Sequence, residues 1–171
     1  WLMSLDPHWF STMFGVYCFS GALVAAFAFV TLVTVALQRG GLLREAVTEE
    51  HYHDLGKLLF AFTVFWAYIG FSQYFLIWYA NLPEETLWFR HRLEGGWQAA
   101  TLALAVGHFV VPFFFLMPQA VKRRPAALAA GAAWMLLMHL VDVHWLVMPA
   151  LHPHGAQPGL TDLAALAAVG G

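Results

Sequence analysis

Two histidines and one carboxylate interrupt the last long hydrophobic stretch of the sequence. His139, Asp142 and His144 lie in a segment that is otherwise apolar. His139 and Asp142 are three residues apart, so they share one face of a helix, whereas His144 lies on another. A carboxylate about 7 to 8 Å inside a membrane helix is costly unless it is paired, hydrated or protonated. The pattern therefore predicts a proton relay, a structural pair that fixes His139 or a neighbouring group, or an interfacial residue that reaches out to water.

A deeper histidine, His108, lies in the preceding hydrophobic stretch. Pro112 follows four residues later and cannot donate a backbone hydrogen bond to the carbonyl of His108. We therefore expect an imidazole and a freed carbonyl at membrane depth. His108 and His139 lie at similar depths, with an offset of roughly 5 Å, which leaves open a b-type haem held by both. The other interpretation is a proton-carrying or packing site at a helix break.

The central hydrophobic stretch, residues 53–81, carries Tyr68, Ser72 and Gln73 near its middle. Tyr68 and Ser72 are four residues apart and share a helix face. Because lipid cannot satisfy hydroxyl groups, we expect this face to look at other helices or at a water-filled cavity. These side chains would then belong to a proton path. Alternatively, Tyr68, Gln73 or His108 would bind the oxygens of a quinone among the second, third and fourth spans.

Ionisable side chains also gather where the central stretch begins. His53, Asp54 and Lys57 lie within its first five residues, and they could load protons into the helix bundle. An ordinary solvated helix start, with carboxylates that complement the helix dipole, explains them as well. The candidate proton path comprises Asp142, His139, His108, Tyr68, Ser72, Gln73, Asp54, His53 and Lys57.

Several classes of chemistry lack their sequence patterns. No serine–histidine–aspartate arrangement, phosphate-binding loop or metal-ligand spacing is present, so the sequence does not indicate a hydrolase or a nucleotide enzyme, and we expect no catalytic residue and no metal site of these kinds. The single cysteine, Cys18, excludes an intrachain disulfide and a cysteine-rich zinc or iron–sulfur motif. A net charge of -2 does not indicate a nucleic-acid partner.

Composition identifies the elements that must position these side chains. The chain is 61% apolar and 11% charged, whereas soluble domains average about 25% charged residues. The sequence predicts an all-α integral membrane protein, a bundle of four transmembrane helices plus the start of a fifth. The expected spans are 8–37, 54–79, 97–117 and 126–147, and a truncated helix begins at about 162. Both ends look cut, so we expect a fragment of a larger multispanning subunit.

Local signals predict where these helices begin and end. Asp6 can cap the first helix, with Pro7 in its first turn. Thr48, followed by two glutamates, can cap the second. Pro83, also followed by two glutamates, predicts a short helix at the membrane interface, with an ordinary connecting loop as the alternative. The last full span should close at residues 148–149.

The distribution of positive charge predicts the orientation. Short loops rich in lysine and arginine stay on the cytoplasmic side of a membrane. We therefore expect residues 39–53 and 118–125 to be cytoplasmic, because they hold most of the basic residues. These are Arg39, Arg44, Lys122, Arg123 and Arg124, against Arg90 and Arg92 in the loop on the other side.

Five segments resemble a known family of membrane subunits. They are SLDPHWFSTMFG at 4–15, HDLGKLLF at 53–60, FSQYFLIWYANLPEE at 71–85, VGHF at 106–109 and WLVMP at 145–149. These segments are similar to the ActF subunits of bacterial alternative complex III, the quinol:cytochrome c oxidoreductase. ActF subunits are also labelled quinone-binding subunit 2 and are related to the NrfD and PsrC membrane proteins.

The resemblance implies a function and a set of partners. It implies a cofactor-free subunit in the bacterial inner membrane, assembled with an iron–sulfur protein, multihaem cytochromes and a sister NrfD-like subunit. Quinol oxidation is usually placed in the sister subunit, and ActF-type subunits are proposed to support proton movement. We therefore expect an electron-transport subunit that supports proton movement and anchoring. The alternatives are a quinone-binding subunit, a purely structural anchor or a b-type haem cytochrome.

Overall fold

The computed structural model describes residues 2–6, 9–43, 45–93 and 96–151. Within these ranges the chain forms helices and no strand, and four helical segments are long and apolar enough to cross a membrane. The prediction of an all-α membrane protein with four spans is confirmed. The predicted fifth helix from about residue 162 lies outside the described residues.

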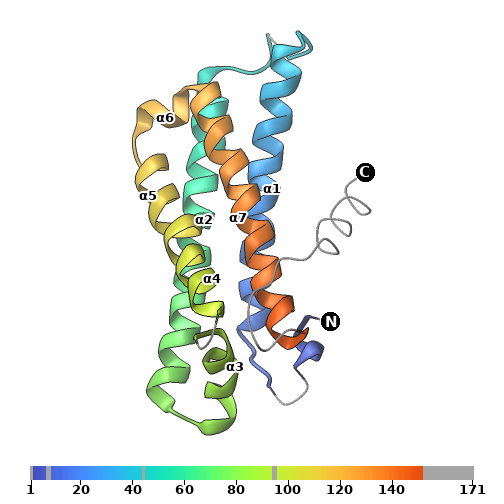
Figure 1. Ribbon diagram of the computed structural model, residues 1–171. Coiled ribbons are helices and arrows are strands. Elements are labelled where there is room, and N and C mark those ends of the chain that lie inside the picture. The colour runs from blue at the N-terminus through green and yellow to red at the C-terminus, as the bar shows by residue number, and fades with distance from the viewer. Residues whose placement is uncertain (1, 7–8, 44, 94–95, 152–171) are drawn as a thin grey trace.

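The four spans run side by side as a bundle (Figure 1). They are α1 (Phe14–Arg39), α2 (Glu49–Ala80), a third span built from three consecutive pieces, and α7 (Pro125–Leu151). The pieces of the third span are α4 (Trp97–Leu104), the π-helix η2 (Ala105–Val110) and α5 (Val111–Leu116). Three short helices connect or precede the spans, namely η1 (Leu2–Leu5), α3 (Pro83–Leu93) and α6 (Gln119–Arg123).

The connections divide between the two ends of the bundle. Figure 1 shows α3 and the N-terminal segment at one end, and α6 with the α1–α2 connection at the other. Nη2 of Arg123 donates to Oε1 of Glu50 across 2.8 Å, which ties the two basic connections together. The two loops predicted to share one side of the membrane therefore lie at the same end of the bundle.

The centre of the bundle is apolar and closely packed. Helix α1 packs against both α2 and α7. Ala28 and Ala132 are fully buried, and their small side chains let α1 and α7 approach each other closely. Leu59 and Leu128, which are also fully buried, fill the adjoining layer. Close packing of this kind holds membrane helices together, because lipid is as apolar as the side chains themselves.

Two of the predicted helix starts are confirmed. Thr48 is the N-cap of α2, and its backbone N–H donates to Nδ1 of His51 at 3.1 Å, so one unpaired donor of the first turn is satisfied. Helix α2 ends at Asn81, which adopts the left-handed conformation with φ 49°. Pro83 begins α3, so this segment is a helix and not an irregular connecting loop.

Two predicted boundaries are wrong. The first helix begins at Phe14 and not at Asp6, because the preceding segment covers the end of the bundle instead. There the Trp9 ring stacks on Trp88 with 4.5 Å between ring centroids. The last span also continues past the predicted end at 148–149, with Pro149 inside α7. Proline removes only one backbone donor, and this loss is small so close to a helix end.

The predicted break in the third span takes the form of the π-helix η2. The N–H of Val111 bonds the carbonyl of Val106, five residues back. In this register, Pro112 leaves the carbonyl of Gly107 without a backbone donor, and Nε1 of Trp134 donates to that oxygen at 2.8 Å. The break is confirmed, and the carbonyl that accepts the Trp134 side chain is that of Gly107, one residue before His108.

Candidate functional site

Asp142 is the centre of the candidate site. Its carboxylate, on α7, is 1% exposed and accepts hydrogen bonds from two other helices. The hydroxyl of Tyr17, on α1, donates to Oδ1 at 2.6 Å, and Nε1 of Trp66, on α2, donates to Oδ2 at 3.2 Å. Asp142 is therefore a buried, hydrogen-bonded group, and the interpretation as an interfacial residue that reaches water is wrong.

His139 lies beside Asp142, as the three-residue spacing predicts. Its Nδ1 is 4.0 Å from Oδ2 of Asp142, which suits an ion pair if the imidazole is protonated but is too long for a hydrogen bond. Nδ1 has no hydrogen-bond partner among the described residues. Gly21 of α1 faces both side chains, because a Cβ there would lie 3.3 Å from Oδ2 of Asp142 and 3.3 Å from Cε1 of His139. The glycine lets α1 approach the pair.

His108 lies behind Trp66 and is fully buried. The two rings stack with 4.0 Å between centroids and 20° between planes. Neither ring nitrogen of His108 has a hydrogen-bond partner among the described residues. An unpaired buried imidazole costs stability, and a π-turn inside a helix is frequent at functional sites. Trp66 thus contacts both His108 and Asp142, and it joins the two predicted sites into one cluster.

An apolar layer separates this cluster from the α6 end of the bundle. Trp66 and Asp54 are twelve residues apart on α2, which is about 18 Å along the helix. The hydroxyl of Thr63, between them, donates to the carbonyl of Leu59 in its own helix. Thr31 of α1 bonds its own helix in the same way. The surrounding buried side chains are apolar: Val24, Ala28, Val35, Leu59, Leu116, Leu128, Ala132 and Met135.

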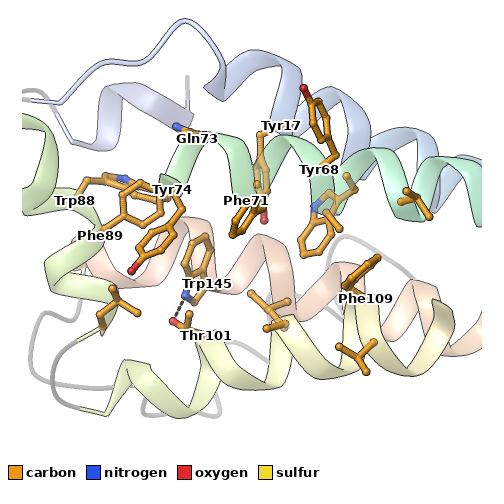
Figure 2. A pocket seen from close by; sticks show the side chains of 18 residues that line it. Tyr17, Tyr68, Phe71, Gln73, Tyr74, Trp88, Phe89, Thr101, Phe109 and Trp145 are labelled. Atoms are coloured by element: carbon orange, nitrogen blue, oxygen red, sulfur yellow. Dashed lines mark hydrogen bonds between the residues drawn. The ribbon is translucent and has the colours of Figure 1, made fainter. Parts of the chain in front are cut away.

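On the other side of the cluster lies a cavity of about 620 Å³ (Figure 2). It is bounded mainly by α2, α3 and the third span, and its walls are largely aromatic. Tyr17 and Trp66, the two donors to Asp142, are among its lining residues. Nε1 of Trp145 donates to the hydroxyl of Thr101 at 2.9 Å on another wall, marked by the dashed line in Figure 2. The buried carboxylate is thus one side chain away from an apolar cavity.

The polar residues of the central span do not form one inward face. Gln73 is buried, and its Nε2 donates to the hydroxyl of Ser11 at 3.1 Å. Ser72 donates to the carbonyl of Ile69 in its own helix. Tyr68 is 64% exposed, and Figure 2 shows its ring directed away from Thr101 and Trp145. Tyr68 is nevertheless among the residues that line the cavity, so the expected face is divided between the cavity and the exposed surface of α2.

The charged start of α2 has the features of a solvated helix end. Nζ of Lys57 is 2.7 Å from Oδ1 of Asp54, and both side chains are exposed. His53 lies 3.8 Å from Oε2 of Glu50, and His51 belongs to the helix cap. Exposed ion pairs of this kind contribute little to stability. These groups lie beyond the apolar layer, and no hydrogen bond between described residues links them to Asp142.

A buried cation, Arg92, is the feature that the sequence analysis misses. We predict it to be an exterior loop charge, yet it is 2% exposed and its guanidinium lies 3.6 Å from the Trp88 ring centroid. Nη1 donates to the carbonyl of Trp88 at 3.1 Å and Nη2 to that of Leu146 at 3.0 Å. Burial lowers the pKa of Arg92 to about 10, so the side chain stays protonated at neutral pH. Arg92 therefore holds α3 against α7.

Tyr17 and Trp66 are also missed by the sequence analysis. Both occur in long aromatic-rich stretches, where a single tyrosine or tryptophan has no distinguishing neighbour. Their bonds to Asp142 span 125 and 76 residues of sequence, so no local spacing indicates them. The available signal is general: a buried carboxylate in a membrane needs donors, and aromatic side chains with an N–H or O–H group are common ones.

The geometry also bears on the haem interpretation. A haem held by two histidines lies between their imidazoles. The ring of His108 is instead stacked on Trp66, and the cavity of about 620 Å³ is lined by neither His108 nor His139. Among the described residues, no group of three or more histidine, cysteine, aspartate or glutamate side chains could hold a metal ion. The described arrangement would have to open before the two histidines could hold a haem.

No protein-family model and no curated protein matches this chain.

Proposed function

We propose that this chain is a membrane subunit of a bacterial respiratory complex of the alternative complex III type, which oxidises quinol and passes electrons to an acceptor. In this role it supports proton movement and anchors the extrinsic subunits. Its partners would be an iron–sulfur protein, multihaem cytochromes and a sister NrfD-like subunit. The resemblance supports the complex and its partners, and the buried polar cluster supports the proton role.

The observation that carries the proton role is the environment of Asp142. A carboxyl group that is almost fully buried in a membrane helix costs free energy, and it is expected to be functional by default. Asp142 has two hydrogen-bond donors from other helices, the partly exposed His139 beside it and the buried His108 behind Trp66. A group that gains and loses a proton needs such partners, because they stabilise the charged form at depth.

The same proposal places the chain in the bacterial inner membrane and gives the side on which its loops lie. Residues 39–53 and 118–125 would face the cytoplasm, since basic loops prefer that side. The ion pair between Arg123 and Glu50 supports a common side for both loops. The cluster around Asp142 and the cavity would then lie nearer the outer surface. Fusing a reporter enzyme that is active only in the cytoplasm to residue 43 or residue 93 tests this orientation.

Proton translocation per electron in vesicles that carry the whole complex tests the proposed function. Asp142→Asn and His139→Leu are compared with the parent at matched assembly. We expect quinol oxidation to persist in both variants while translocation falls. If translocation stays at the parental value, Asp142 and His139 are structural and the chain is only an anchor. Leu140→Val, next to the cluster but on an exposed face, is the matched control.

A quinone-binding subunit is the second candidate, and the cavity favours it. The aromatic walls suit a flat, lipid-soluble ring, and the cavity lies mainly between the second and third spans, with Trp145 of the fourth span in its lining. Of the residues expected to bind quinone, Tyr68 and Gln73 are among those that line it, whereas His108 is not. A quinone analogue with a photoreactive group would label the cavity side of α2 or α4 if this candidate is correct. A Soret band in the purified subunit would instead support the haem alternative.

A further inference from the structure

The two side chains that donate hydrogen bonds to Asp142 have a second property in common. Tyr17 and Trp66 each bind one oxygen of the carboxylate, and each also lines the cavity of about 620 Å³. Tyr17 and Trp66 therefore separate the buried carboxyl group of Asp142 from the cavity. Of the two, only Tyr17 has a hydroxyl group, which can donate one proton and accept another at the same oxygen. The indole N–H of Trp66 is a donor only.

We propose that Asp142 exchanges its proton with the cavity through the hydroxyl of Tyr17, and that it does not exchange through the α6 end of this chain. This inference rests on the proposed proton-carrying role of Asp142. It adds the side from which the proton arrives and the residue through which it passes.

The geometry at Tyr17 suits this transfer. The distance of 2.6 Å between its oxygen and Oδ1 of Asp142 is short for a hydrogen bond and typical of one made to a carboxylate. By contrast, Nδ1 of His139 is 4.0 Å from the other carboxylate oxygen. His108 faces Trp66, and its nitrogens have no hydrogen-bond partner among the described residues. Tyr17 is thus the shorter of the direct proton connections to Asp142 among the described residues.

The packing on the opposite side supports the same direction. Between Asp142 and the α6 end, the described buried side chains are apolar except for Thr31, Thr63 and Lys122. The hydroxyls of the two threonines are turned back onto their own helices, and Nζ of Lys122 donates to the carbonyl of Met117. A proton cannot pass such a layer without a chain of hydrogen-bonding groups or water. The cavity, in contrast, has polar groups in its lining, among them the hydroxyls of Tyr17 and Thr101, which can bind a water molecule or a membrane-soluble phenol.

The transfer itself leaves Tyr17 unchanged. The O–H bond of Tyr17 breaks as its proton moves to Oδ1 of Asp142, and a new O–H bond forms on the same oxygen. The second proton comes from a hydroxyl donor in the cavity, either a protonated water or a membrane-soluble phenol. Asp142 ends as a neutral acid and Tyr17 as a neutral phenol, while the donor loses one proton. No electron is transferred, and the reverse sequence releases the proton.

The test is the rate of hydrogen–deuterium exchange at Asp142. The protein is studied in its full assembly, in vesicles of synthetic phosphatidylcholine. On transfer to D₂O, infrared spectroscopy follows the C=O stretching band of the protonated carboxyl group, which Asp142→Asn identifies by its loss. Tyr17→Phe keeps the aromatic ring and removes the hydroxyl, and we expect exchange to slow about tenfold or more. Repeating the experiment with an added membrane-soluble phenol distinguishes the two donors. If water is the donor, exchange occurs without the phenol. If a phenol is the donor, exchange occurs only when the phenol is present.

A second pair of variants keeps the test independent of Tyr17. Ala105→Phe fills the cavity from the third span, away from the carboxylate, and should also slow exchange. Leu102→Phe, on the exposed side of the same span, is the matched control and should not. Parental exchange rates in both Tyr17→Phe and Ala105→Phe would overturn the inference, as would a complex in which no protonated Asp142 is detected at any pH. Slower exchange with unchanged proton translocation would support the inference and contradict the proposed function.

Discussion

Replacing Arg92 with lysine should destabilise the bundle although the charge is kept. Arg92 donates to the carbonyls of Trp88 and Leu146, and it lies over the Trp88 ring. Each hydrogen bond from a charged donor contributes about 1.5–3 kcal/mol, and a desolvated cation–π contact about 2 kcal/mol. A lysine ammonium is a point charge that reaches only one of the two carbonyls and cannot stack as a plane. We therefore expect the free energy of unfolding to fall by about 2–3 kcal/mol.

Unfolding in detergent micelles, followed by circular dichroism during titration with a denaturing detergent, measures this loss. Arg124→Lys is the matched control, because it makes the same change at an exposed arginine. Its effect should stay within about 0.5 kcal/mol. If Arg92→Lys is as stable as the parent, the two carbonyl bonds and the ring contact do not hold α3 against α7, and the reasoning from burial is wrong.

Three further predictions concern single positions. Above about pH 10 the parent should gain stability relative to Arg92→Leu. The pKa of Arg92 is lower in the folded state, so above about pH 10 the unfolded chain binds more protons than the folded one and stability rises with pH; paired unfolding curves test this. Gly56→Ala should lower the unfolding free energy by about 1–2 kcal/mol net of helix propensity, because its Cβ would lie 2.7 Å from Cγ of Lys122. Gly15→Ala is its control in the same assay. A Cβ at Gly15 meets nothing within 4 Å, so this variant should be neutral or more stable. Trp134→Phe removes the donor to the Gly107 carbonyl and should cost about 1–2 kcal/mol, measured in the same way.

The helices could be predicted from the sequence because their signals are local. A long apolar run identifies each span, and Thr48 with two following glutamates identifies the start of α2. The start at Asp6 fails for a non-local reason. Trp9 stacks on Trp88, a residue far along the chain, and this contact holds the segment outside the helix. Helix propensity is a weak preference that tertiary packing overrides.

The site could be predicted only in part. The pairing of His139 with Asp142 follows from helical spacing, and the depth of His108 follows from its place in a span. The partners Tyr17 and Trp66 come from other helices, and the sequence does not say how those helices rotate about their axes. The same uncertainty explains Tyr68, since a polar face at membrane depth needs cover but the sequence does not say which helix provides it.

The last prediction concerns the exposed face of α2 that carries Tyr68. Tyr68 is 64% exposed at a depth where lipid offers no hydrogen-bond partner, and Ser72 lies one turn away. If protons cross the complex, the part of the route beyond the apolar layer must involve other protein, and this face is a candidate for contact with it. Tyr68→Phe should then lower proton translocation by the assembled complex while leaving hydrogen–deuterium exchange at Asp142 at the parental rate. Unchanged translocation would mean that Tyr68 only packs against its neighbours, and that the route continues along another surface of the chain.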